Sequence, residues 1–101
     1  MTPRVSPEAE QDLDEMELWL TENWGPLAAA NIIEAVLDRI AALADMPLAG
    51  APRPEFGETV RFVTASRYLI DYEVSERDLT VLRILHGAQD RASIMRRSAD
   101  D

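Results

Sequence analysis

The chain has 101 residues, a formal net charge of −9 and no cysteine. The length suits one domain, and 47% hydrophobic residues are enough for a buried core and argue against disorder. Without cysteine there is no thiolate chemistry, and a lone His86 cannot form a histidine-rich metal site, so we expect no metal and no cofactor. No apolar run approaches a membrane span and no signal peptide is visible, which predicts a cytoplasmic protein without membrane contact.

Negative charge is concentrated in the first half of the chain. Residues 1–45 contain two arginines and ten acidic residues, whereas residues 46–101 contain eight arginines and nine acidic residues. Because nucleic acids are bound mainly through clustered positive charge, this balance opposes such binding. We therefore expect no direct nucleic-acid binding by this protein alone.

The first half has the pattern of two helices. Ser6-Pro7 is typical of a helix start, because Ser6 can cap free N–H groups and Pro7 fits the first helical position. Apolar residues then recur at spacings of three and four, which predicts one apolar stripe: Ala9, Leu13, Met16 and Leu20. Gly25-Pro26 separates this helix from a second one expected over residues 26–44. So short a connection predicts an antiparallel helical hairpin.

The second half has the pattern of a sheet. Residues 46–58 contain three prolines and two glycines, which indicates an irregular connector. Strands are expected over residues 60–63, 67–74 and 79–85, with a polar turn at 75–78 and a possible edge strand at 2–5.

Alternation along these strands predicts which side chains share a face. Tyr68, Ile70 and Tyr72 fall on one side of the middle strand, and a core position suits the two tyrosines better than a base-stacking platform. In the last strand, Leu82 and Ile84 are expected opposite Val81 and Leu85. The predicted fold class is α+β: the antiparallel α-hairpin packs on a three- to four-stranded antiparallel β-sheet. One domain is expected over residues 1–97, with a frayed tail at 98–101.

Basic residues gather on or beside the predicted strands: Arg61, Arg67, Arg83, His86 and Arg91. They form either a cationic patch for a phosphate, a nucleic acid or an acidic protein, or a set of local ion pairs. Arg83, for instance, could pair with Asp71 or Glu73 across neighbouring strands. For His86, a structural role fits better than a catalytic one.

A second candidate site consists of Leu18, Trp19 and Trp24. Two tryptophans and an outward leucine near one helix exceed what a small solvated domain needs, and exposed aromatics often mark interfaces. The alternative is that both tryptophans cover the edge of the core.

Four segments resemble one family of proteins. They are Val5–Leu13 (VSPEAEQDL), residues 46–54 (MPLAGAPRP), Arg67–Val74 (RYLIDYEV) and Val81–Asp90 (VLRILHGAQD). In order and spacing they are similar to ParE toxins of the RelE/ParE superfamily, from bacterial type II toxin–antitoxin systems. The resemblance implies the same α-hairpin on a sheet and a ParD-like antitoxin whose C-terminal segment folds onto the toxin.

The resemblance also implies one of two activities. ParE toxins are described as poisoning DNA gyrase and so blocking replication, whereas RelE relatives cut mRNA in the ribosome with cationic and tyrosyl groups. Where RelE-type relatives place arginine directly after the middle-strand tyrosine, this chain has Leu69. Where they place arginine shortly after the glycine that ends the last strand, it has Gln89, and near their tail tyrosine it has Met95. Phosphoryl chemistry without cationic stabilisers loses most of its electrostatic support, so we expect a non-enzymatic toxin.

The leading hypothesis is therefore a gyrase-binding toxin, with no catalytic residues. We expect antitoxin contacts at Leu18, Trp19, Trp24, Arg61, Arg67 and Arg83, and target contacts at Arg91, Arg96 and Arg97. The alternatives are a ribosome-dependent endoribonuclease that uses Arg83, His86 and Arg91, and a non-toxic relative that only binds the antitoxin.

Overall fold

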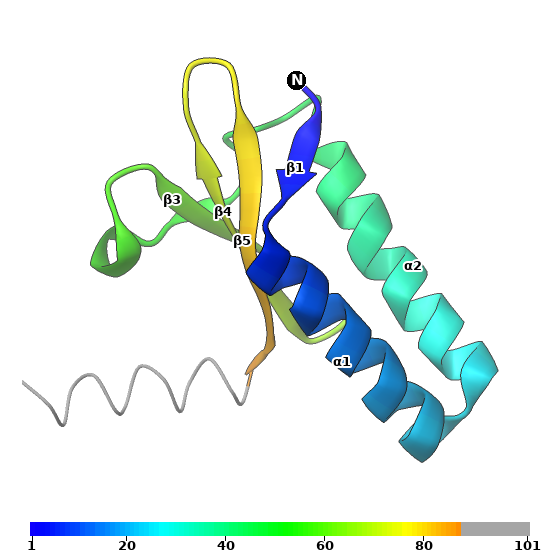
Figure 1. The fold of residues 1–101 in the computed structure, drawn as a ribbon. Coiled ribbons are helices and arrows are strands. Elements are labelled where there is room, and N and C mark those ends of the chain that lie inside the picture. Colours follow the sequence, from blue (N-terminus) through cyan, green and yellow to red (C-terminus); the bar gives the residue numbers. More distant parts are fainter. Residues whose placement is uncertain (88–101) are drawn as a thin grey trace, which may run out of the picture.

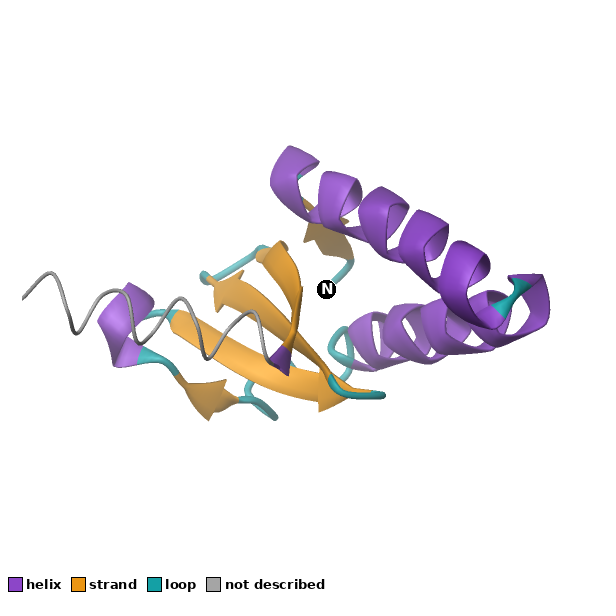
Figure 2. Cartoon of the chain, turned by 90° about the horizontal axis from the view of Figure 1, so that it is seen from below, coloured by secondary structure: helices purple, strands orange, loops and turns teal. Residues whose placement is uncertain are grey.

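A helical hairpin lies beside a twisted sheet in the computed structural model, which describes residues 1–87 (Figures 1 and 2). The elements follow in the order β1 (Pro3–Val5), α1 (Pro7–Trp24), α2 (Pro26–Ala42), β2 (Ala51–Pro52), the 3₁₀ turn η1 (Pro54–Phe56), β3 (Val60–Ala65), β4 (Tyr68–Val74) and β5 (Leu79–His86). The hairpin connection lies at the end that projects beyond the sheet (Figure 2). No helix within residues 1–87 combines the length and apolarity that crossing a membrane requires.

The predicted helix signals are confirmed. The Ser6 hydroxyl accepts a hydrogen bond from the Ala9 N–H at 3.0 Å and so caps α1. Gly25 has φ +91°, a conformation that side chains rarely adopt, and this lets the chain turn directly from α1 into α2. The second helix ends at Ala42, two residues before the predicted end.

The sheet has five strands in the order β1-β5-β4-β3-β2, so the prediction of three to four antiparallel strands was wrong in two respects. The expected edge strand exists as β1, but it pairs with β5 in parallel. The connector, predicted to be irregular, contributes the two-residue strand β2, where Ala51 lies opposite Phe62. This strand was not predicted because proline lacks the N–H that strand pairing uses and so indicates a loop. Pro52 is tolerated here because β2 is an edge strand.

The alternation predicted for the last strand was also wrong. Val81 and Ile84 are both buried although they are three positions apart, a spacing that would place them on opposite faces of a regular strand. The pairing of β4 with β5 shows a shift in register: Asp71 lies opposite Arg83, but the adjacent Tyr72 lies opposite Val81, so Leu82 is skipped. An extra residue in one strand of an antiparallel pair forms a β-bulge, which returns Ile84 to the core face.

The core lies between the hairpin and one face of the sheet. Tyr68, Ile70 and Tyr72 are buried there, as predicted. The Tyr72 hydroxyl accepts a hydrogen bond from the Gly50 N–H at 2.9 Å and donates one to the Pro47 carbonyl at 2.8 Å. The connector is thereby fastened to the core.

Candidate functional site

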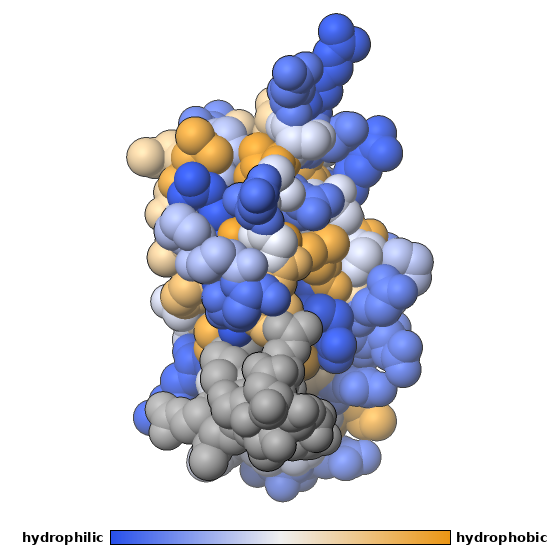
Figure 3. All heavy atoms as spheres, turned by 90° about the vertical axis from the view of Figure 1, so that its left-hand side faces the viewer, coloured by the Kyte–Doolittle hydropathy of each residue, from blue (hydrophilic) through white to orange (hydrophobic). Residues whose placement is uncertain are grey.

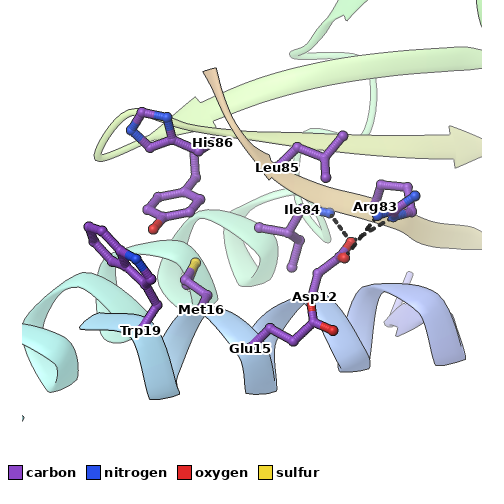
Figure 4. Close-up of a pocket in the computed structure, with 9 residues that line it drawn as sticks. Asp12, Glu15, Met16, Trp19, Arg83, Ile84, Leu85 and His86 are labelled. Carbon is purple, nitrogen blue, oxygen red and sulfur yellow. Dashed lines mark hydrogen bonds and ion pairs between the residues drawn. The ribbon is translucent and has the colours of Figure 1, made fainter. Parts of the chain in front are cut away.

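A groove of about 440 Å³ opens between α1 and the C-terminal end of β5 (Figure 4). Helix α1 contributes Asp12, Glu15, Met16 and Trp19, the strand contributes residues 83–86, and Tyr68 comes from β4. The groove exists because β1 pairs with β5 only as far as Val81. Beyond that point α1, rather than another strand, lies along β5.

Ser6, the N-cap residue of α1, and Asp12 within α1 supply hydrogen-bond partners along the edge of β5 that β1 leaves open. Ser6 donates its backbone N–H to the Val81 carbonyl and its hydroxyl to the Leu82 carbonyl, both at 2.9 Å. One carboxylate oxygen of Asp12 accepts the Ile84 N–H at 2.9 Å. Buried backbone N–H and C=O groups need such partners, so these side chains protect the strand edge from pairing with another chain.

Asp12 also holds Arg83 in a two-point ion pair. The Arg83 Nε donates to Asp12 Oδ2 at 2.8 Å and Nη2 donates to Oδ1 at 3.0 Å (Figure 4). These hydrogen bonds raise the pKa of the Arg83 guanidinium above its ordinary value. The predicted pairing of Arg83 with Asp71 or Glu73 was therefore wrong: the β5 bulge and the open strand edge direct Arg83 to α1 instead.

Among the residues that the structure describes, the lining of this groove has a net negative formal charge. It contains two carboxylates, Asp12 and Glu15, against one guanidinium, which Asp12 already binds. Glu15 accepts a hydrogen bond from the neighbouring Gln11 amide at 3.2 Å, a contact that leaves its charge in place. Along this described lining, a phosphate would meet more negative charge than positive.

Two ring systems form the end of the groove next to the sheet. The rings of Tyr68 and His86 meet edge to face, with centroids 5.5 Å apart and planes at 85°. Burial raises the pKa of the Tyr68 hydroxyl above its ordinary value of 10.0, because the charged form is poorly solvated there. No hydrogen bond joins this hydroxyl to another residue of the described range. With Met16 and Trp19 opposite, this end suits apolar or aromatic side chains of a partner.

The matches with known proteins decide the family. The model of the ParE toxin of the type II toxin–antitoxin system parDE matches residues 4–91. The chain belongs to this family. A solved structure described as the chromosomal ParDE TA system from P. aeruginosa is similar to this ParE chain with a TM-score of 0.74 and 23% identity, over 85% of this chain and 95% of that chain. No curated protein matches.

Within residues 1–87 of this ParE family member, the predicted basic group is only partly brought together: Arg83 and His86 line the groove beside β5, whereas Arg61 and Arg67 do not. Arg61 is half-buried and donates to the carbonyl groups of Leu48 and Gly50, at 3.3 and 2.7 Å, so it holds the connector. Arg67 is exposed in the turn between β3 and β4 with φ 72°. Arg83 is bound by Asp12. Arg91, Arg96 and Arg97 lie outside the described residues, so the predicted target contacts stay a prediction.

Leu18, Trp19 and Trp24 are exposed, with 61%, 53% and 68% of their surface accessible. The two tryptophans therefore do not cover the edge of the core, which was the alternative to an interface role. Only Trp19 lines the groove between α1 and β5. The predicted contact set is thus divided between the groove and other parts of the hairpin surface.

The face of the sheet opposite the helices carries a buried charge pair that sequence patterns missed. Asp71 alternates with core residues and so points to this face, where Arg53 donates to it at 2.9 Å. Arg53 is only 3% exposed and lies over the rings of Phe56 and Phe62, 4.5 and 5.3 Å from their centroids. The available signal was a carboxylate placed directly between two core residues of the strand, Ile70 and Tyr72. Figure 3, which views the molecule from the side of η1, shows hydrophobic atoms interspersed among hydrophilic ones.

Leu69 lies on the same sheet face as Asp71. It is half-buried, and its partner in register on β5 is Leu85. The RelE type of mRNA cleavage is expected to use an arginine at this position. Here the position belongs instead to the apolar register pair of Leu69 and Leu85. Within residues 1–87 no cluster of three or more His, Asp or Glu side chains is placed to hold a metal ion.

Proposed function

We propose that this chain is a toxin that binds DNA gyrase, blocks replication in the cytoplasm and is neutralised by a ParD-like antitoxin. Membership of the ParE family supports the toxin role. The observation that carries the mode of action is the ion pair between Arg83 and Asp12. It neutralises the one arginine that lines the groove within residues 1–87, which favours a toxin that acts by binding a protein.

Electrostatics argues against cleavage of RNA. A phosphoryl-transfer site places positive groups around the charge that develops on the phosphate. Among the described residues, the charges lining the groove are two carboxylates and one bound guanidinium, and Leu69 lies opposite Leu85 in an apolar register pair. We therefore propose that the toxin is not an enzyme.

One observation favours a second candidate, the ribosome-dependent endoribonuclease. Arg83, His86 and Tyr68 do line one groove, and together they offer a cation and two proton-transfer groups. This activity would require Arg83 to leave Asp12, because a guanidinium already bound in two-point fashion is poorly placed to stabilise a phosphorane.

A supercoiling assay with purified gyrase tests the proposal. We expect the purified toxin to inhibit supercoiling in a dose-dependent way, and we expect the ParD-like antitoxin to restore it. Relaxation of the same plasmid by a type I topoisomerase serves as the control and should be unaffected. Full gyrase activity at saturating toxin, in a preparation that arrests growth when induced in cells, would contradict gyrase as the target. Absence of growth arrest would instead support the non-toxic, antitoxin-binding relative.

A further inference from the structure

A second groove, of about 600 Å³, runs between α1 and α2 and shares no residue with the groove beside β5. Along α2 it extends from Pro26 to Asp38. At 1.5 Å per residue this is about 18 Å, or three helical turns. The groove therefore has the length of a short helix.

The floor of this groove is apolar. Ala29 and Ala30 leave it hollow because their side chains are small, and Ile33 and Leu37 continue it along α2. Leu37 is 46% exposed and Ile33 is half-buried, so hydrophobic surface remains in contact with water. The apolar stripe of an amphipathic helix, with side chains at spacings of three and four, would cover such a floor.

The rim of the groove is acidic on both sides. Glu17 stands on the α1 side, and Glu34 and Asp38, one turn apart, stand on the α2 side. Within residues 1–87, no basic residue lines this groove. Within the described part of the chain, no hydrogen bond or ion pair engages these three carboxylates, whereas Asp12 and Asp71 are each bound by an arginine. The rim charge is therefore available to a partner.

We propose that this groove binds an amphipathic helix of a partner protein, about 12 residues long, with lysine or arginine on both flanks of its apolar stripe. The long side chains of such a helix would cover the rim with their apolar stems while their charged ends meet Glu17 on one side and Glu34 and Asp38 on the other. A helix with acidic flanks would be repelled. The surface is separate from the groove beside β5, and the proposal holds whichever target the toxin acts on.

Two synthetic helical peptides of 14 residues test the proposal. Both have the same leucine stripe, and one has lysine flanks while the other has glutamate flanks. Binding of each labelled peptide to the purified full chain is followed by fluorescence anisotropy at low and high salt. We expect the lysine peptide to bind at least tenfold more tightly at low salt, with a smaller difference at high salt.

Variants separate the groove from the general negative charge of the chain. We expect Glu34→Lys with Asp38→Lys to weaken the lysine peptide at least tenfold and to strengthen the glutamate peptide. Glu58→Lys with Glu76→Lys makes the same change in net charge on exposed residues outside the groove, and it should keep the original preference. Ala30→Trp fills the floor without changing charge and should abolish binding of the lysine peptide. Circular dichroism checks that each variant is folded. Equal binding of both peptides, or equal losses in the two charge-reversal variants, would overturn the proposal.

Discussion

The Asp71→Asn variant is expected to lower the free energy of unfolding by about 3–5 kcal/mol, the range for breaking a buried ion pair by removing one partner. Arg53 and Asp71 are both buried, and their side chains meet at 2.9 Å. Asparagine keeps the volume of aspartate but removes its charge, so the guanidinium stays buried without its closest carboxylate. Urea unfolding followed by circular dichroism measures the loss.

Glu55→Gln is the matched control for this prediction. It also removes a carboxylate bound to Arg53, at 3.3 Å, but the Glu55 side chain is 46% exposed. Exposed ion pairs contribute about 0–1 kcal/mol, so this variant should be far less destabilised than Asp71→Asn. Similar losses in the two variants would show that burial does not determine the strength of the Arg53 interactions.

The Gly50→Ala variant is expected to be destabilised by about 2–3 kcal/mol, as is typical when atoms are forced into a packed region. A Cβ at this position would lie 2.5 Å from the Phe62 carbonyl oxygen and 2.6 Å from the Tyr72 hydroxyl. The carbonyl belongs to β3 and cannot move freely, so the connector must shift. The shift would also disturb the hydrogen bond between the Gly50 N–H and Tyr72.

The same substitution at Gly87 is the control for Gly50→Ala. A Cβ there would have its nearest neighbours at 3.6 Å, which is ordinary contact. We expect Gly87→Ala to change the free energy of unfolding by less than about 0.5 kcal/mol. The two thermal or urea unfolding curves should therefore differ clearly, and coincident curves would contradict the close approach at Gly50.

Local signals in the sequence were sufficient for much of the fold. Ser6-Pro7 and Gly25-Pro26 act on the backbone next to them, so the limits of α1 and the hairpin turn could be read directly. Alternation also placed Tyr68 and Tyr72 in the core. The β5 bulge could not be found in this way, because it is a relation between two strands.

The candidate site was harder to predict because its key contact joins distant segments. Arg83 and Asp12 are 71 residues apart, and each has nearer residues of opposite charge in the sequence. Their pairing depends on α1 lying beside the open edge of β5, which only the assembled fold provides. For the same reason the sequence left open whether the arginines on neighbouring strands form one patch or separate local contacts, and the structure gives Arg61 and Arg83 separate structural partners.

The distribution of charge links the structure to the proposed mode of action. Acidic residues line the groove beside β5 and the rim of the groove between the helices. Arg53, Arg61 and Arg83 are already bound by carboxylate or carbonyl oxygens of the chain itself. Within residues 1–87, such a charge distribution disfavours contact with a phosphate backbone and suits contacts with protein segments. We therefore propose that the toxin harms the cell by binding a protein and leaves RNA intact.

Primer extension across translated mRNAs tests this claim most directly. RNA is taken from cells at the onset of growth arrest after the toxin is induced, and it is compared with RNA from uninduced cells. We predict growth arrest with the same full-length extension products in both samples. New 5′ ends inside translated reading frames, appearing with the arrest and absent when the antitoxin is co-expressed, would contradict it.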